Sequence, residues 1–395
     1  MKWLTMKDYY DVLVAGAGPA GSVAAKTAAE RGLSVLLIEK KQEIGEPVRC
    51  AEGMTAEGLR QFLEPDPKWI SSRVRRSKFF SPGASLTFSD DRDAVYILER
   101  KLFDRELARQ AAVAGADVLT KTQATGLIVE NGQVCGLTGK SFGDDFSVRA
   151  RAVVAADGME SRIGRRAGID TRLQPKDMAG CVQYHLTDID LDPACCEFYY
   201  GSRWAPGGYA WVFPKGDNEA NVGLGIMSSS RVSGRPIDYL DDFAGWRFPG
   251  AHILGTVVGG VSVSGMMAKL STAGLVLVGD AGRLTDPLTG EGILNGMISG
   301  RIAGNVIADC CAKGDMSSDA LSKYDREIRR QLGPALDRNY RLKEYLRKAS
   351  DTKLDWTIRG LMAIKVESIP VTKLLSEIYT PASRRAARFI RLLAR

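Results

Sequence analysis

The feature that most constrains this chain is a glycine-rich turn between an apolar strand and an alanine-rich helix. Residues 11–15 have the composition of a buried strand, and Gly16, Gly18 and Gly21 follow in the spacing G-x-G-x-x-G. Residues 22–31 have the composition of a helix. In such an arrangement the first glycine makes the tight turn, the second lets the backbone approach a pyrophosphate, and the third lets the helix pack on the strand. The sequence therefore predicts a dinucleotide site.

A second apolar segment, residues 34–39, ends in an acidic residue, Glu39. Together with the preceding strand and helix it completes a βαβ unit, the pattern of a parallel sheet. A carboxylate at the end of the second strand can accept hydrogen bonds from ribose hydroxyls and disfavours the 2′-phosphate of NADP. This motif therefore leaves NAD or FAD as the ligand.

Two later segments favour FAD. One apolar strand ends at Asp157, and another, residues 275–280, ends in Asp280. A carboxylate at a strand end can reach the ribityl hydroxyls of a flavin. The turn that contains Gly290 and Gly292 opens a long helix and can direct backbone N–H groups at the flavin pyrimidine oxygen. In this order along the chain, the segments predict an FAD site.

Between these segments the composition changes to alternating apolar and aromatic residues, which is typical of an antiparallel sheet. We expect an α/β fold with an α+β insert: a Rossmann-type FAD-binding domain, an inserted antiparallel-sheet substrate domain and a C-terminal helical segment. The expected segments are residues 1–75, 98–172 and 271–330 for the FAD-binding domain, 76–97 for strands of the substrate domain, 173–270 for the substrate domain itself, and 331–395 for a basic helical region.

Composition excludes several other classes. The chain has two histidines, and its seven cysteines form no Cys-x-x-Cys pair, so we expect no metal site and no disulfide framework. No apolar run approaches the ~18 residues of a membrane-spanning helix, and no signal peptide is evident. We therefore expect a cytoplasmic location. The formal net charge of +7 fits phosphate-bearing ligands or an anionic membrane.

One cluster of basic residues lies at the C-terminus. Arg384, Arg388, Arg391 and Arg395 fall on one face of a predicted helix, and no acidic residue follows Glu377. This pattern favours an interfacial helix that binds anionic lipid at the inner face of the cell membrane. The alternative is an amphipathic helix packed on its own protein, with a solvated arginine face. We expect no nucleic-acid partner, because no nucleic-acid-binding module accompanies the charge.

Three segments resemble the geranylgeranyl reductase family, whose members are FAD-dependent oxidoreductases of the p-hydroxybenzoate hydroxylase fold. They are residues 45–53 (GEPVRCAEG), 209–214 (YAWVFP) and 287–293 (PLTGEGI). The resemblance extends from about residue 10 to the C-terminal helices and is greatest to archaeal members that act on ether-lipid precursors. One departure is Arg283 after Asp280, where small residues are commoner in the family.

The resemblance implies specific site residues. The FAD contacts that it transfers are Ala20, Glu39, Cys50, Ala51, Gly53, Arg100, Ala124, Asp280, Gly292 and Ile293. It also places Tyr209, Trp211 and Phe213 along a lipid pocket. Their alternation puts all three on one face of a strand, although ordinary core packing would produce the same pattern.

For catalysis, Cys50 is the leading candidate, as a proton donor or a gate beside the flavin. The alternative is a small residue that only packs there, because a neutral thiol is a weak acid with a pKa of about 8.5. Glu52 and Glu291 are alternative proton sources. Either group would supply the proton that accompanies a hydride from flavin N5.

The function implied by the resemblance is the saturation of isolated C=C bonds in geranylgeranyl chains on archaeal ether-lipid precursors. Such an enzyme needs an isoprenoid lipid substrate and an external electron donor; reduced ferredoxin, a deazaflavin and NADPH all remain open. Two other functions remain possible, a flavin-dependent aromatic monooxygenase and a membrane-associated electron-carrier flavoprotein that changes no lipid.

Overall fold

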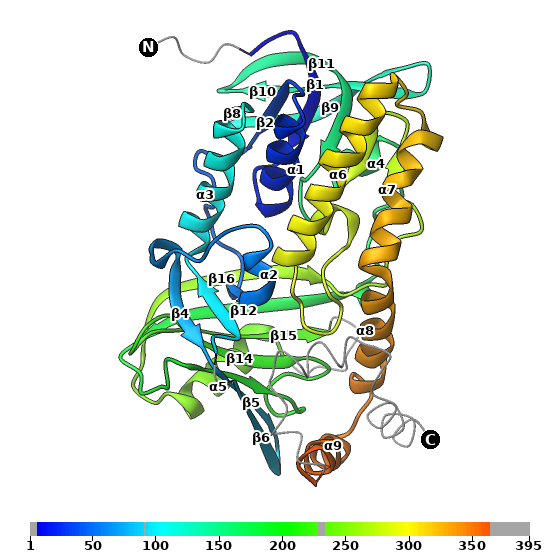
Figure 1. Cartoon of the computed structure of the whole chain (residues 1–395). Helices are drawn as coiled ribbons and strands as arrows, with labels where there is room; N and C mark the ends of the chain where they lie inside the picture. The colour runs from blue at the N-terminus through cyan, green and yellow to red at the C-terminus, as the bar shows by residue number, and fades with distance from the viewer. Residues whose placement is uncertain (1–5, 91, 228–233, 364–395) are drawn as a thin grey trace. The chain divides into compact units, whose positions relative to one another are not determined.

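The computed structural model describes residues 6–90, 92–227 and 234–363 of the chain (Figure 1). The chain divides into two compact units. Unit 1 comprises Met1–Val48, Arg100–Gln174 and Ser262–Arg338, and unit 2 comprises Arg49–Glu99, Pro175–Val261 and Asn339–Arg395. The architecture is mixed α/β, as the sequence predicts, with one sheet that is largely parallel and another that is largely antiparallel.

Unit 1 is built on an eight-stranded sheet in the order β17-β18-β11-β1-β2-β8, with β10 and β9 added beside β11. The strands are β1 (Tyr9–Ala15), β2 (Val35–Ile38), β8 (Asp117–Leu119), β9 (Thr122–Glu130), β10 (Gln133–Ser141), β11 (Asp144–Ala155), β17 (Ser271–Thr272) and β18 (Leu275–Leu277). The pairings from β8 through β2, β1 and β11 to β18 are all parallel. β18 is shorter than predicted, because a 3-10 turn, η3 (Gly279–Gly282), contains Asp280.

The helices of unit 1 are α1 (Pro19–Glu30), α3 (Arg100–Val113), α4 (Arg162–Arg166), α6 (Ile293–Lys313) and α7 (Ser318–Gln331). α1 contacts both α3 and α6, and α6 contacts α7 (Figure 1). Alanines of α1 share one buried cluster with the apolar residues of β1, β2 and β11. The apolar strand residues and the small residues of α1 therefore form the core of this unit together.

The contact between α1 and α6 depends on a row of glycines at every fourth position of α6. A Cβ at Gly300 would lie 2.2 Å from the carbonyl oxygen of Ala20, and a Cβ at Gly304 would lie 2.7 Å from Cβ of Thr27. Both distances are shorter than a non-bonded contact allows. The absence of side chains at these glycines of α6 therefore sets how closely the two helices approach.

Unit 2 contains a seven-stranded sheet in the order β16-β12-β15-β14-β13-β5-β6 and a three-stranded sheet in the order β3-β7-β4. The strands are β3 (Gly53–Thr55), β4 (Ile70–Val74), β5 (Arg76–Ser81), β6 (Ala84–Ser89), β7 (Val95–Leu98), β12 (Met178–Thr187), β13 (Cys195–Tyr199), β14 (Tyr209–Pro214), β15 (Ala220–Met227) and β16 (His252–Ser262). In the larger sheet the pairings β12–β15, β15–β14, β14–β13 and β5–β6 are antiparallel, whereas β13 pairs with β5 in parallel. The sequence did not predict this pairing, which joins segments far apart in the chain.

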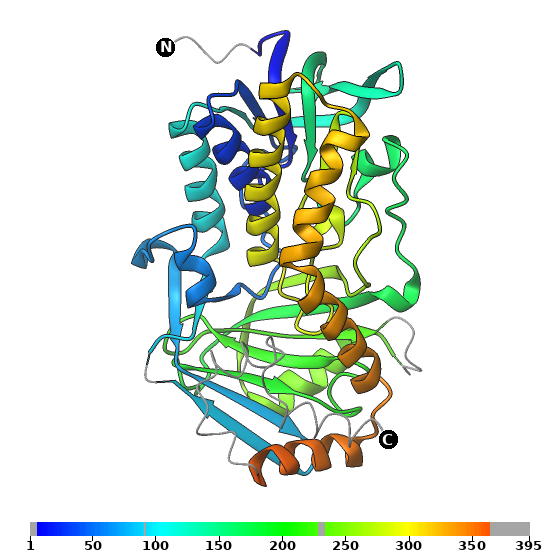
Figure 2. The same cartoon turned by 45° about the vertical axis from the view of Figure 1, so that its right-hand side comes forward.

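The helical elements of unit 2 are α2 (Ala56–Arg60), η1 (Pro67–Trp69), η2 (Pro175–Asp177), α5 (Pro236–Arg247) and α9 (Asp351–Ala363). α8 (Gly333–Leu346) begins in unit 1 and continues into unit 2. α9 packs on β5 and β6 (Figure 2). The predicted arginine face at residues 384–395 lies outside the described residues. Along the described chain, no helix is long and apolar enough to cross a membrane.

The two faces of the seven-stranded sheet differ. Ala210 and Val212 of β14 belong to a buried cluster with Leu240 and Phe243 of α5. The intervening residues, Tyr209, Trp211 and Phe213, point to the opposite face, where successive ring centroids lie 5.9 and 6.5 Å apart. The shared aromatic face predicted from their alternation is confirmed. We call this surface the aromatic face; it also includes Phe79, Phe198 and Tyr200.

Replacing Gly300 with alanine is expected to lower the free energy of unfolding by about 1–3 kcal/mol, because the added methyl group meets a backbone carbonyl that cannot rotate away. Gly245, in α5, is the control. A Cβ there would have no atom of the described residues within 4 Å, apart from its chain neighbours and the adjacent backbone of α5 itself. Gly245→Ala should stabilise by about 0.5–1 kcal/mol. Denaturant unfolding measures both changes; equal effects of the two substitutions would contradict the close approach of α1 and α6.

Candidate functional site

In unit 1 the sequence-predicted nucleotide residues gather at one edge of the parallel sheet. β1 pairs with β2 on one side and β11 on the other, so the strand order reverses at β1. Ligands of such sheets bind beyond the carboxyl ends of the strands at this switch point. The G-x-G-x-x-G turn follows β1, Glu39 follows β2, and Asp157 lies two residues after β11.

The glycines of the turn are required by close contacts. Gly16 has a φ of +111°, and a Cβ there would lie 2.3 Å from the carbonyl oxygen of Ala156. A Cβ at Gly21 would lie 1.9 Å from the carbonyl oxygen of Gly16. Gly18, by contrast, faces open space and is the N-cap of α1 without a side-chain hydrogen bond to the helix. The turn therefore fits a pyrophosphate, which needs open space beside free helix N–H groups.

Two carboxylates border this turn. Glu39 is buried, and its Oε2 accepts a hydrogen bond from the backbone N–H of Ala17 at 3.0 Å, which holds the side chain against the turn. Asp157 accepts a hydrogen bond from the N–H of Ile163 through Oδ2, while its Oδ1 is buried without a hydrogen-bond partner in the described part of the chain. Burial raises the pKa of Asp157. An acceptor with no protein donor is consistent with a polar ligand group at this edge.

The segment after β18 comes to the same part of unit 1. A Cβ at Gly279 would lie 2.9 Å from Cβ of Ala20, so η3 packs on the first turn of α1. Asp280 is exposed, and its Oδ1 accepts a hydrogen bond from Thr285 at 2.8 Å. A Cβ at Gly292 would lie 3.2 Å from the same Oδ1. The structure thus brings Ala20, Asp280 and Gly292 together, as a shared cofactor site requires.

The turn before α6 is built by Asp286, whose Oδ1 accepts hydrogen bonds from the N–H groups of Leu288 and Thr289 at 2.9 and 3.0 Å. Gly290 completes the turn with a φ of +74°. Glu291 follows, and its Oε1 is buried with no hydrogen-bond partner among the described residues. Burial, and secondly the nearby Asp286, raise the pKa of Glu291 to about 7. Glu291 can therefore hold or release a proton near neutral pH.

The other transferred positions lie elsewhere in the two units. In unit 1, Arg100 begins α3 and forms a two-point ion pair with Asp104, and Ala124 lies on β9. Ile293 is the first residue of α6. Cys50, Ala51 and Gly53 belong to unit 2. Their roles in binding the flavin remain predictions.

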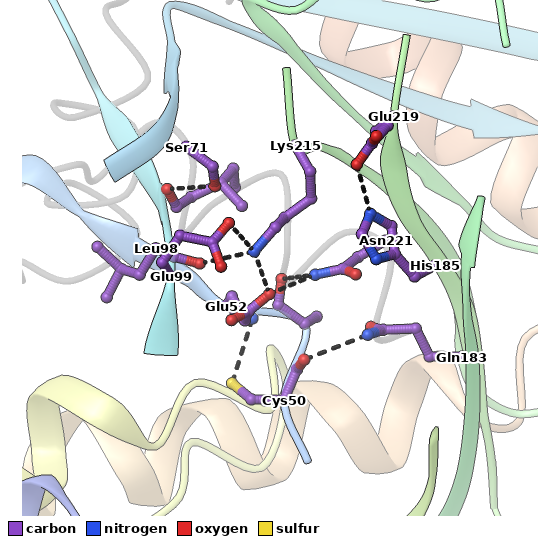
Figure 3. Close-up of polar contacts among 12 residues, drawn as sticks. Cys50, Glu52, Ser71, Leu98, Glu99, Gln183, His185, Lys215, Glu219 and Asn221 are labelled. Atoms are coloured by element: carbon purple, nitrogen blue, oxygen red, sulfur yellow. Dashed lines mark hydrogen bonds and ion pairs between the residues drawn. The ribbon is translucent and has the colours of Figure 1, made fainter. Parts of the chain in front are cut away.

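In unit 2, residues 50–53, which we call the cysteine loop, lie on the seven-stranded sheet (Figure 3). Gln183 of β12 donates a hydrogen bond to the carbonyl oxygen of Cys50 at 3.3 Å. Asn221 of β15 donates to the carbonyl oxygen of Ala51 at 3.4 Å and to Glu52 Oε2 at 2.7 Å. The cysteine loop is thus held by side chains of two neighbouring strands.

A buried ion pair, which the sequence did not predict, joins the same loop to the end of β14. Lys215 Nζ lies 2.7 Å from Glu52 Oε2 and 2.6 Å from Glu99 Oε1, and it donates to the carbonyl oxygen of Leu98 at 3.1 Å (Figure 3). The side chains of Lys215 and Glu52 are each 6% exposed. Removing one partner of such a pair would cost on the order of 3–5 kcal/mol. The available sequence signal was the position of Lys215 directly after YAWVFP.

The parallel sheet and the glycine-rich edge of unit 1 define a dinucleotide-binding protein, and comparisons with known proteins show that it is an oxidoreductase. Residues 11–183 match the family described as FAD dependent oxidoreductase, and residues 177–261 match the geranylgeranyl reductase catalytic domain. The chain is 58% identical to digeranylgeranylglycerophospholipid reductase of Methanocella arvoryzae, over 95% of this chain and 97% of that protein. The corresponding protein of Methanosarcina acetivorans is 48% identical, over 95% and 94%.

Among solved structures, a geranylgeranyl bacteriochlorophyll reductase-like protein from Thermoplasma acidophilum superposes with a TM-score of 0.90. It is 37% identical, and the match covers 98% of this chain and 99% of that one. The chain belongs to the geranylgeranyl reductase family. It is an FAD-dependent reductase, and the family resemblance predicted from the sequence is confirmed.

The raised pKa of Glu291 predicts a pH-dependent stability. A carboxyl group whose pKa is higher in the folded state stabilises the fold at pH values below its unfolded pKa of about 4.3. That contribution is lost as the pH rises through about 7. Glu291→Gln, which stays neutral, should therefore match the wild type at pH 4 and be more stable at pH 8. Thermal unfolding of both proteins between these pH values measures the difference.

Glu160 is exposed and provides the control, so Glu160→Gln should show no such divergence. A Glu291→Gln protein that parallels the wild type at every pH would show that Glu291 is not a buried titrating group.

Proposed function

We propose that the protein saturates the isolated C=C bonds of geranylgeranyl chains carried by archaeal ether phospholipid precursors. The observation that carries the substrate assignment is the near full-length similarity to relatives named digeranylgeranylglycerophospholipid reductase. The aromatic face of unit 2 supports it, because its six neighbouring ring side chains offer a hydrocarbon chain an apolar surface.

FAD, when bound and reduced, supplies the hydride for such a reaction. The residues of unit 1 serve to bind it: the glycine turn with Glu39, and the segment of Asp280 and Gly292. An isolated alkene also needs a proton at the second carbon, and we propose Cys50 as its donor. Glu52 and Glu291 are the alternative donors, and the pKa of Glu291, about 7, lets it carry a proton at physiological pH. The electrons come from an external donor such as reduced ferredoxin, a deazaflavin or NADPH.

The decisive experiment is anaerobic. Purified holoprotein is reduced with dithionite and mixed with geranylgeranylated glycerophospholipid, and lipid mass is followed beside controls that lack protein or lack dithionite. A gain of two mass units per double bond is expected. Cys50→Ser and Cys50→Ala should lower the rate by about 10²–10⁴-fold if the thiol delivers the proton. A full rate in both variants would exclude Cys50 as the donor.

Unchanged lipid mass with fully reduced FAD would argue against the reductase. Rapid reoxidation in air that is stimulated by an aromatic compound would then favour the monooxygenase. Electron exchange with redox proteins, without any change in lipid mass, would favour the electron carrier.

We further propose that the protein binds peripherally to anionic membranes, and α9 of unit 2 supports this. Trp356 is 72% exposed, and Lys353 and Arg359, three positions to either side, are also exposed. The acidic residues of α9 bind the protein: Asp351 binds Ser202, and Asp355 binds Ser81. Arg359 donates to the carbonyl oxygen of Gly83 at 3.0 Å but stays exposed. The outer surface of α9 therefore combines an interfacial aromatic residue with positive charge.

Trp356→Ala should weaken binding to vesicles that contain phosphatidylglycerol by about tenfold, because the indole no longer inserts at the interface. Co-sedimentation with such vesicles, and with neutral phosphatidylcholine vesicles, measures this. Phe142→Ala is the control, since Phe142 is an exposed aromatic residue (66%) that belongs to unit 1 and not to α9. Equal loss in both variants, or binding that does not depend on lipid charge, would contradict the role of α9.

A further inference from the structure

The cysteine loop contacts the seven-stranded sheet at every one of its residues. Cys50 and Ala51 accept hydrogen bonds through their carbonyl oxygens, and the carboxylate of Glu52 accepts two through one oxygen. Gly53 lies against the ring of Phe213, since a Cβ there would be 3.1 Å from Cε2. Part of the aromatic face is therefore occupied by the loop itself, so its residues do more than line a lipid site.

Trp211 is connected to the cysteine loop by hydrogen bonds through one residue, Gln183. Its indole Nε1–H donates to Gln183 Oε1 at 3.1 Å, and Gln183 Nε2 donates to the carbonyl oxygen of Cys50 at 3.3 Å. Trp211 is on β14 and Gln183 is on β12, with β15 between them. The indole can cross β15 because Gly223 has no side chain: a Cβ there would lie 2.5 Å from Cζ2 of the ring. The absence of a side chain at Gly223 thus allows the hydrogen bonds that link Trp211 to Cys50 through Gln183.

Lys215 holds the other end of the loop. The Glu52 carboxylate is fixed by Lys215 and Asn221, both at 2.7 Å. The backbone of Glu52 has a φ of +73°, a left-handed conformation that is unfavourable for a residue with a Cβ. In this conformation its N–H donates to Cys50 Sγ at 3.2 Å. The anchored carboxylate therefore supports the backbone conformation that directs an N–H group at the thiol.

From this geometry we infer that Trp211 and Lys215 are positioning residues of the reductase: they fix the orientation of the Cys50 thiol through Gln183 and Glu52. The inference rests on the proposed function, in which Cys50 acts in the reduction. It reassigns Trp211, since a side chain that only lines the lipid pocket would affect how tightly the lipid binds. A side chain that fixes the thiol would affect the rate of the bound complex.

The test combines a structural and a kinetic measurement on the holoprotein. Trp211→Phe keeps the ring and removes the N–H group. Hydrogen–deuterium exchange of the peptide that spans residues 50–53 should become about fivefold faster, the effect of one lost hydrogen bond. Anaerobic lipid reduction should show a lower kcat with little change in KM. Lys215→Met and Gly223→Ala, which act on the two anchors separately, should give the same pattern.

Trp204→Phe is the matched control. Trp204 lies in the buried cluster on the α5 side of the sheet, and its Nε1 has no hydrogen-bond partner in the described part of the chain. This variant should exchange and turn over like the wild type.

Exchange at residues 50–53 that is unchanged in Trp211→Phe and Gly223→Ala would overturn the inference, as would a raised KM with unaltered kcat. Should Lys215→Met fail to fold, these two variants still decide. A wild-type protein that reduces no lipid would refute the proposed function. Hydrogen–deuterium exchange needs no lipid turnover, so it would still report whether Trp211 and Lys215 fix the cysteine loop.

Discussion

The parallel pairing of β1 with both β2 and β11 is the constraint on which unit 1 depends. It brings the carboxyl ends of strands from three parts of the chain to one edge, and the turn after β1 can follow only because Gly16 and Gly21 allow backbone contacts shorter than a side chain permits. α6 is held against α1 by the same means, through Gly300. Close approach of backbone segments, more than any single polar contact, shapes the edge of the parallel sheet at which the predicted nucleotide-binding residues lie.

In unit 2 the two faces of the seven-stranded sheet are built differently. α5 covers one face with an ordinary apolar core. The aromatic face combines ring side chains with a few buried polar groups, and these are satisfied by one another: Trp211 by Gln183, and Lys215 by Glu52. Because an unpaired polar group would be costly in such surroundings, the polar network specifies one arrangement of the loop that it contacts.

Much of the fold followed from local pattern. The βαβ unit, the strands of the parallel sheet and the shared side of Tyr209, Trp211 and Phe213 were predicted, since each depends on residues that are close in sequence. The parallel pairing of β13 with β5 was not predicted, nor was the contact between Glu52 and Lys215, which are 163 positions apart. Periodicity reports which face of an element is buried, but carries no information about which distant element covers it.

The sequence by itself determined the class of the protein, because the spacing of Gly16, Gly18 and Gly21 between a strand and a helix is compatible with few structures other than a dinucleotide-binding turn. Only the tertiary structure decided what surrounds the cysteine loop. A glycine such as Gly223 looks like any other in the sequence. Its effect arises when folding places the ring of Trp211 across it, and packing between distant strands is a property of three-dimensional contact alone.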